Sequence, residues 1–200
     1  MFQEILSYIE TNPLDVAGGI LGLLYLLLEI KENIIMWIVG CIMPAIYIFV
    51  LYDKGIYADC GMEIFYFIVG IYGFAVWLRR GMKGDTSPKA VVIRRTPKRT
   101  SIVLTITAIV LWIGLVLFLK NCTDSRVPVV DGLTTALSIV AYWMLSRKYI
   151  EQWWVWFVVD FISTCLYVYK GIYARSILYG VYTIMAVYGY FAWKRKAKLN

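Results

Sequence analysis

Residues 152–173 read QWWVWFVVDFISTCLYVYKGIY, a stretch with the length and apolarity of a membrane-spanning helix and an aspartate near its middle. At 100° per residue, five aromatic or polar side chains fall on one face of this helix. They are Trp153, Trp156, Asp160, Thr164 and Tyr167. A carboxylate is costly near the centre of a bilayer, so we expect Asp160 to face a cavity or a partner group.

Two interpretations of this face are open. In the first, two indoles one turn apart beside a carboxylate form a site for a flat, cationic, aromatic ligand. In the second, the tryptophans belong to an interfacial aromatic belt and Asp160 is a hydrogen-bonding group between helices. Trp156 lies one turn deeper than Trp153, which favours the ligand site.

The composition indicates a polytopic membrane protein. Hydrophobic residues make up 61% of the 200 residues, whereas a soluble domain contains about 45–50% apolar residues. The chain has no histidine, and its four cysteines form no CxxC pair, so we expect no metal site, no cofactor and no His-based catalysis. Cys60 and Cys122 are expected in loops on the same side of the membrane. They would pair only if that side is oxidising and the loops approach each other.

Apolar runs predict an all-α fold with seven transmembrane helices. The predicted spans are 14–30, 34–52, 62–78, 101–119, 128–145, 152–173 and 176–193. Residues 1–13 precede them as a segment on the membrane surface, 79–100 form a basic loop, and 194–200 form a basic tail. The helix within 101–120 offers no group for a ligand at its midsection, so we interpret it as a linker.

An internal repeat links the two halves of the chain. At an offset of 116 residues, the segment Lys54-Gly-Ile-Tyr-Ala58 matches Lys170-Gly-Ile-Tyr-Ala174 without a gap. Further identities follow at the same offset: Asp15 and Asp131, Trp37 and Trp153, Tyr66 and Tyr182, Tyr72-Gly73 and Tyr188-Gly189, and Trp77 and Trp193. The pattern predicts two three-helix repeats, 14–78 and 128–193, that enter the membrane in the same direction because one linker helix separates them (3+1+3). Asp160 aligns with Pro44, so the halves differ where a ligand site is expected.

The distribution of positive charge predicts the orientation. With seven spans, one side of the membrane holds 15 Lys and Arg residues and the other side holds five. The positive-inside rule then places the N-terminus outside and the C-terminus in the cytoplasm. The net charge of +7 is therefore explained by loops that flank the membrane, and no nucleic-acid partner is expected.

The chain resembles the PnuC (Pnu) family of bacterial vitamin transporters over nearly its whole length. Trp153-x-x-Trp156-x-x-x-Asp160 is similar to that family's WxxWxxxN/D motif, and residues 167–173 and 189–194 also resemble it. The resemblance implies a homotrimer in the bacterial cytoplasmic membrane that carries an unphosphorylated vitamin by facilitated diffusion. A separate cytoplasmic kinase would trap the vitamin, as in NAD biosynthesis, without a required contact. The usual substrate of the family is nicotinamide riboside, and some members carry thiamine or riboflavin instead.

The candidate substrate-binding residues fall into two ranks. Trp153 and Trp156 are expected to stack on the ligand ring and Asp160 to bind its charge or a polar group. The second rank is Gln152, Asn33, Tyr142, Trp143 and Tyr188. An enzyme is not expected, because no nucleophile with a base and no metal cage is present. A seven-helix photoreceptor is not expected either, because it would need a lysine midway along the last helix for a Schiff base, and the seventh span has none there. A non-transporting receptor would fit the composition but would not explain the repeat or Asp160.

Overall fold

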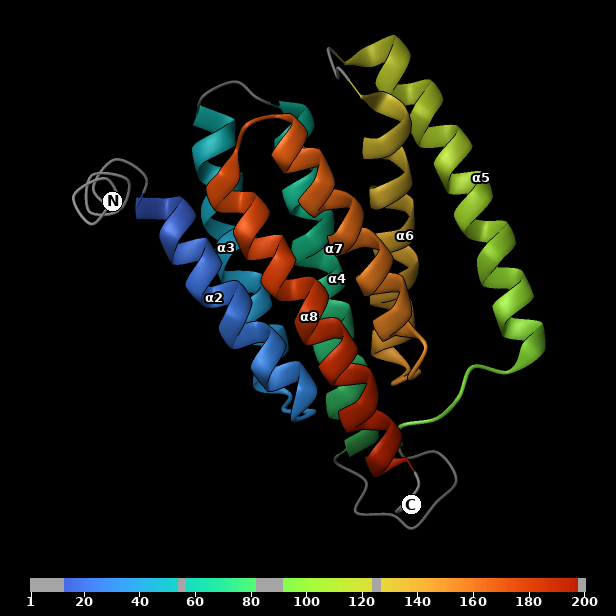
Figure 1. Ribbon diagram of the computed structural model, residues 1–200. Helices are drawn as coiled ribbons and strands as arrows, with labels where there is room; N and C mark the ends of the chain where they lie inside the picture. Colours follow the sequence, from blue (N-terminus) through green and yellow to red (C-terminus); the bar gives the residue numbers. More distant parts are fainter. Residues whose placement is uncertain (1–12, 54–56, 82–91, 124–126, 198–200) are drawn as a thin grey trace. The chain divides into compact units, whose positions relative to one another are not determined.

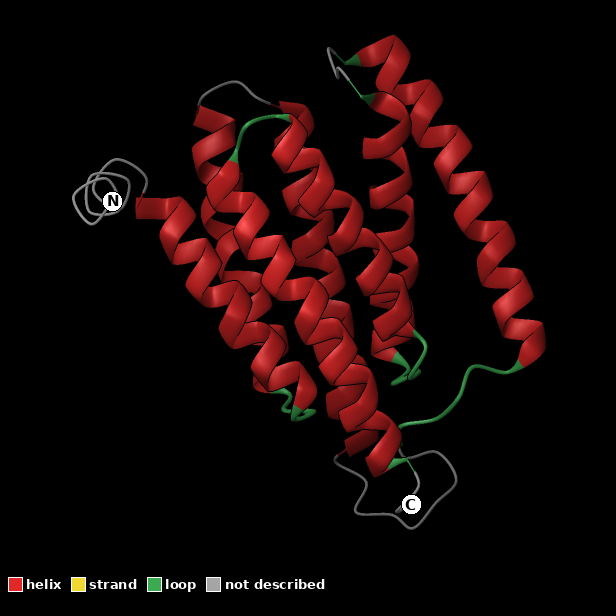
Figure 2. Ribbon diagram, viewed as in Figure 1, coloured by secondary structure: helices red, strands yellow, loops and turns green. Residues whose placement is uncertain are grey.

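The chain is represented by a computed structural model that describes residues 13–53, 57–81, 92–123 and 127–197. The expected surface segment therefore lies almost entirely outside the described residues, as do the first three residues of the Lys54–Ala58 match. The described residues form seven helices (Figures 1 and 2). They divide into two compact units, Met1–Met82 and Lys83–Asn200, named unit 1 and unit 2 below.

Unit 1 contains three helices and unit 2 contains four. In unit 1 they are α2 (Pro13–Ile30), α3 (Ile35–Asp53) and α4 (Tyr57–Gly81). In unit 2 they are α5 (Lys98–Cys122), α6 (Pro128–Ser146), α7 (Gln152–Tyr169) and α8 (Tyr173–Lys196). Four of the seven, α3, α4, α5 and α6, are long and apolar enough to cross a membrane. Both α7 and α8 carry many tyrosine, tryptophan and polar residues, which lower their apolarity.

A tryptophan packed on a glycine holds α3 against α4 in unit 1. The Trp37 side chain is 1% exposed, and its ring occupies the space where a Cβ atom on Gly73 would lie. The ring of Trp77 meets that of Trp37 edge to face, with centroids 5.7 Å apart and planes at 85°. Only glycine lets the two helices approach this closely, which explains Gly73 in the middle of α4.

Unit 2 contains the same contact 116 residues later. The Trp153 ring of α7 lies where a Cβ atom on Gly189 of α8 would lie. Trp153 also meets Trp193 edge to face, at 5.5 Å and 88°. The pairing of α7 with α8 therefore rests on the same side chains as the pairing of α3 with α4.

The turn between α2 and α3 has the same hydrogen bonds as the turn between α6 and α7. Glu32 has a φ of 59° and Lys148 a φ of 53°. The Glu32 N–H donates to the Glu29 carbonyl at 2.9 Å, and the Lys148 N–H donates to the Leu145 carbonyl at 2.9 Å. Glutamate and lysine rarely adopt a positive φ. Because Glu32 and Lys148 occupy equivalent positions and both do so, the two turns share one backbone conformation.

Cys60 lies inside α4, so the prediction that it belongs to a loop is wrong. Its side chain is 4% exposed, and its thiol lies 3.5 Å from the Ile48 carbonyl as a hydrogen-bond donor. In unit 2 the Ser176 hydroxyl donates to the Thr164 carbonyl at 3.2 Å. Ser176 and Thr164 are the residues 116 positions after Cys60 and Ile48. Cys122, by contrast, is an exposed free thiol at the end of α5.

The sixth predicted helix ends earlier than expected, at Tyr169 instead of residue 173. Gly171 has a φ of +72°, a conformation that glycine adopts without strain. The Gly171 N–H donates to the Val168 carbonyl at 3.0 Å and the Ile172 N–H to the Tyr167 carbonyl at 2.9 Å. This is the hydrogen-bond pattern of a glycine-terminated helix end, and α8 begins at Tyr173 directly after it.

Residues 92–97, which precede α5, are bound to the α6–α7 turn. They lie within the range 79–100 that was predicted to be a loop. Arg94 forms a parallel β-bridge with Tyr149, and its guanidinium lies 5.0 Å from the centroid of the Tyr149 ring. The Thr96 N–H and hydroxyl both donate to a Glu151 carboxylate oxygen at 2.8 Å. Residues 92–97 therefore form a strap across the start of α7.

Candidate functional site

Asp160 is the acidic group at the middle of α7. The residue is 6% exposed. Because Trp153 packs on Gly189 and Thr164 lies beside Gly180, the antiparallel packing of α7 on α8 brings Tyr182 to the level of Asp160. The Thr164 hydroxyl donates to the Asp160 backbone carbonyl at 2.7 Å, so that threonine is occupied within its own helix. A buried carboxylate beside a phenol is a strong acceptor that can hold a cation or an N–H or O–H donor of a ligand.

Trp156 lies one turn before Asp160 and is half-buried. Its ring meets the Tyr142 ring of α6 edge to face, with centroids 5.0 Å apart and planes at 84°. The Trp156 Nε1–H is buried and has no hydrogen-bond partner among the described residues. The predicted second-rank residue Tyr142 is thus beside the first-rank residue Trp156, and an aromatic corner formed by two helices precedes the carboxylate.

Trp153 and Gln152 lie at the start of α7 and are fully buried, each at 0% exposure. The Trp153 ring is covered by Gly189 and Trp193 of α8, as described above. The structure therefore separates the two tryptophans of the motif by environment. Trp156 stays partly open, whereas Trp153 fills the α7–α8 interface.

The structure gives each of the remaining second-rank residues surroundings of its own. Trp143 packs with Val140, Met144 and Tyr149 in an apolar cluster, and the Arg147 guanidinium lies 5.3 Å from the centroid of its ring. Tyr188 is 58% exposed on α8. Asn33 belongs to unit 1, where its Oδ1 accepts a hydrogen bond from the Ile35 N–H at 3.0 Å at the start of α3.

Three tyrosines of unit 2 form a series of ring contacts near Asp160, although no ligand role was predicted for them from the sequence. Tyr182 is at the level of Asp160 in the α7–α8 packing, Tyr179 lies 5.6 Å from Tyr182 between ring centroids, and Tyr167 lies 5.2 Å from Tyr179. The sequence did contain a signal, because Tyr179 and Tyr182 are on one helical stripe of α8 and Tyr167 shares the Asp160 face of α7. A tyrosine stripe is common in helix packing, so the pattern alone did not separate the two roles.

The side chains near Asp160 are of types that bind a ligand ring and its polar groups. No group of three or more His, Cys, Asp or Glu side chains that could hold a metal occurs within the described residues. The groups that converge are a carboxylate, an indole and several phenols. Such a set suits a flat, electron-poor or cationic ring with a few polar substituents.

The structure is that of a multi-pass helical membrane protein in which aromatic side chains lie beside a buried acid of α7, an arrangement that fits a transporter of small molecules. Residues 12–195 match the family model for the nicotinamide mononucleotide transporter. The chain belongs to this family, since the match covers nearly all of it.

Proteins similar to this chain include curated vitamin transporters and one solved structure. The nicotinamide riboside transporter PnuC of Escherichia coli is 26% identical over 94% of this chain and 88% of its own. The riboflavin/roseoflavin transporter RibM of Streptomyces davaonensis is 23% identical over 90% of this chain and 83% of its own. A crystal structure of the vitamin B3 transporter PnuC aligns with a TM-score of 0.76 and 22% identity, covering 98% of this chain and 86% of the crystallised one. These relatives are named as transporters and none as an enzyme.

Proposed function

We propose that this chain carries unphosphorylated nicotinamide riboside across the bacterial cytoplasmic membrane by facilitated diffusion. The observation that carries the proposal is Asp160, a buried acid on the α7 face that also presents Trp156. Nicotinamide riboside combines a flat pyridinium cation with an amide and ribose hydroxyls. Trp156 and Tyr142 would contact the ring face and edge, and Asp160 would bind the positive charge or a polar substituent.

Charge favours the nucleoside over its phosphorylated form. A phosphate monoester adds about −1.5 to −2 charges at neutral pH. Placing that charge near Asp160, in a segment buried from water, would add repulsion and desolvation costs to binding. Nicotinamide riboside carries no such group, and phosphorylation by a cytoplasmic kinase would make the product a poor ligand. Uptake would then be drawn inward toward NAD biosynthesis without contact between transporter and kinase.

We assign Trp156 to direct stacking and Trp153 to support of the site. Full burial against Gly189 and Trp193 leaves no face of the Trp153 ring open, which favours a positioning role over the stacking predicted from sequence. Gln152 has the same burial, and we give it the same supporting role. The ligand roles of Asn33, Trp143 and Tyr188 stay predictions.

The proposed architecture is 3+1+3, with repeats 14–78 and 128–193 joined by the helix within 101–120, in a homotrimer. The tryptophan–glycine–tryptophan contacts, the paired turns and the Cys60 and Ser176 hydrogen bonds support the repeat, because each recurs at an offset of 116 residues. Helix α5 packs on α6 and contains no buried residue, as suits a linker that faces lipid. The distribution of basic residues supports an orientation with the N-terminus outside and the tail 194–200 in the cytoplasm, with 79–100 on the same side as the tail.

Thiamine and riboflavin are the alternative substrates, and one relative is named a riboflavin/roseoflavin transporter. Thiamine is a flat cation and satisfies the same argument as nicotinamide riboside. Riboflavin is neutral, so it would use Asp160 only as a hydrogen-bond acceptor and would gain less from it. The site chemistry thus ranks the two cations above riboflavin.

Calorimetric titration of the purified protein tests the proposal. We expect micromolar binding of nicotinamide riboside, equivalent to about −8 kcal/mol, with nicotinamide mononucleotide bound at least about tenfold more weakly, a difference of about 1.4 kcal/mol. Binding of thiamine alone would keep the site and change the substrate. Equal binding of the riboside and the mononucleotide would contradict the charge argument. Uptake into proteoliposomes that stops at equal inner and outer concentrations, and continues when a kinase and ATP are enclosed, would establish facilitated diffusion with trapping.

A further inference from the structure

The rings of Tyr182, Tyr179 and Tyr167 form a continuous series, and the α7–α8 packing places its first member, Tyr182, at the level of Asp160. The Tyr179 and Tyr182 centroids are 5.6 Å apart with planes at 63°, and the Tyr167 and Tyr179 centroids are 5.2 Å apart with planes at 32°. All three side chains are half-buried. Each ring is therefore in contact with the next and each retains open surface.

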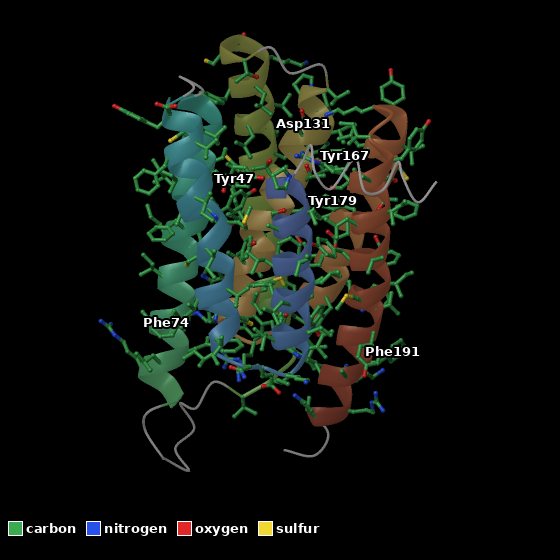
Figure 3. All side chains as sticks on the ribbon, turned by 90° about the vertical axis from the view of Figure 1, so that its left-hand side faces the viewer. Tyr47, Phe74, Asp131, Tyr167, Tyr179 and Phe191 are labelled. Atoms are coloured by element: carbon green, nitrogen blue, oxygen red, sulfur yellow. The ribbon has the colours of Figure 1, made fainter. Side chains whose placement is uncertain are left out.

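The series runs from the middle of α7 to the end where α7 stops and α8 begins. Tyr167 is seven residues beyond Asp160, or about 10 Å along a helix that rises 1.5 Å per residue. It lies in the last turn of α7, which ends at Tyr169. In Figure 3, Tyr167, Tyr179 and Asp131 are labelled near the same end of unit 2. Asp131 belongs to the first turn of α6, so acidic and aromatic groups are both present there.

A cation already lies near the outermost ring. The Arg175 guanidinium is 6.0 Å from the centroid of the Tyr167 ring, at the limit for an attractive cation–π contact. Arg175 is exposed in the first turn of α8. The Tyr167 ring therefore lies beside a planar cation, as it would for a planar cationic ligand that arrives from solvent.

We propose that Tyr167, Tyr179 and Tyr182 form an access path along which a flat cationic ligand passes from ring to ring to Asp160, with Tyr182 contacting the bound ligand. This inference rests on the proposed function. With the proposed orientation, the path opens on the outer side of the membrane. Successive ring contacts replace part of the hydration that the cation loses as it leaves water, which lowers the barrier to entry more than it changes the final affinity.

Unit 1 has no such path at the equivalent positions. Leu51 stands where Tyr167 stands in unit 2, and Glu63 stands where Tyr179 stands. Only Tyr66, the counterpart of Tyr182, is aromatic. The series is therefore an addition to the shared helical framework and not a part of it.

The test combines equilibrium binding with initial uptake rates for nicotinamide riboside. For Tyr167→Leu and Tyr179→Leu, we expect initial uptake at subsaturating concentration to fall about tenfold, while the calorimetric Kd changes less than about threefold. Tyr182→Leu is expected to weaken the Kd as well. Tyr179→Phe keeps the ring and should restore the wild-type rate. Tyr169→Leu is the matched control, because Tyr169 is on the same helix, two residues from Tyr167, and is 82% exposed.

The outcomes separate the path from the proposed function. If Tyr167→Leu and Tyr179→Leu took up the ligand as fast as Tyr169→Leu, while Asp160→Ala lost binding, the path would be wrong and the site would stand. Equal loss in Tyr179→Phe and Tyr179→Leu would also overturn the path, since the ring face would not be the active group. If the wild type bound neither nicotinamide riboside nor thiamine, the proposed function itself would fail.

Discussion

Helices α3 of unit 1 and α7 of unit 2 hold their neighbours in the same way and present different side chains. Each begins with a buried tryptophan that packs on a glycine of the next helix, Trp37 on Gly73 and Trp153 on Gly189. One turn further on, the two helices diverge. Gly40 in α3 stands where Trp156 stands in α7, and Pro44 stands where Asp160 stands.

The difference separates residues that build the helical framework from residues that serve the ligand. A side chain needed for packing is present in both units, because both units solve the same packing problem. A side chain needed for binding is required only where the ligand is held. By this criterion, and under the proposed function, we assign Trp153 to the framework and Trp156 and Asp160 to the site, although all three lie on one face of one helix.

The largest expected effect is the loss of ligand binding in Asp160→Ala. Removing the buried carboxylate should raise the calorimetric Kd for nicotinamide riboside about 100-fold, or about 2.7 kcal/mol. The matched change in unit 1, Pro44→Ala, should alter the Kd by less than about threefold, because no charge is lost there. Asp160→Asn keeps a hydrogen-bond acceptor and should fall between them. Equal loss in Asp160→Ala and Pro44→Ala would contradict the division between framework and site.

Alanine at the two packing glycines should destabilise both units to a similar degree. The new Cβ atom of Gly73→Ala or Gly189→Ala meets an indole ring, and overpacking of this kind costs about 1–3 kcal/mol. Thermal unfolding in detergent should show comparable decreases in Tm. Only Gly189→Ala should also weaken ligand binding, because it displaces the ring of Trp153, and Trp153 lies one turn from Trp156. A decrease in Tm for one variant alone would show that the two contacts are not equivalent.

A smaller effect is expected for the strap of residues 92–97, which is bound to the α6–α7 turn of unit 2. Glu151→Ala removes both hydrogen bonds from Thr96, a loss of about 1–2 kcal/mol of local stability. Trypsin should then cut after Arg94 or Arg95 about tenfold faster, since cleavage follows local opening. Glu151→Gln retains one acceptor oxygen and should be cut at an intermediate rate. Unchanged cleavage in Glu151→Ala would mean that the carboxylate does not hold the strap.

The smallest expected effect concerns the paired hydrogen bonds to the α3 and α7 backbones. Ser176→Ala and Cys60→Ala each remove one donor to a carbonyl. Side-chain hydrogen bonds in membrane proteins contribute about 0.6 kcal/mol on average, so each variant should lose about that much in unfolding free energy. The serine variant should lose slightly more, because a thiol is the weaker donor. A loss well above this in either variant would indicate a role beyond helix packing.

Much of the fold followed from local patterns in the sequence. The apolar runs gave seven helices, and the bounds of the first, second and fifth agree with the structure to within a residue at each end. The end of α7 was predicted four residues too late, although Gly171 is the residue type that a positive φ favours and could have indicated the earlier end. The strap at 92–97 was not predictable, because its partners on the α6–α7 turn lie more than 50 residues away in the chain.

For the site, the sequence by itself determined that Asp160 lies at the middle of an apolar helix and that Trp153, Trp156 and Asp160 share a face. Helical periodicity is a local property, so it can be computed from one chain segment. It could not decide which tryptophan is open, because both lie on the same side of α7. That decision belongs to the tertiary structure, where Gly189 and Trp193 of α8 close over Trp153, while Trp156 meets Tyr142 of α6 and remains half-open beside the acid.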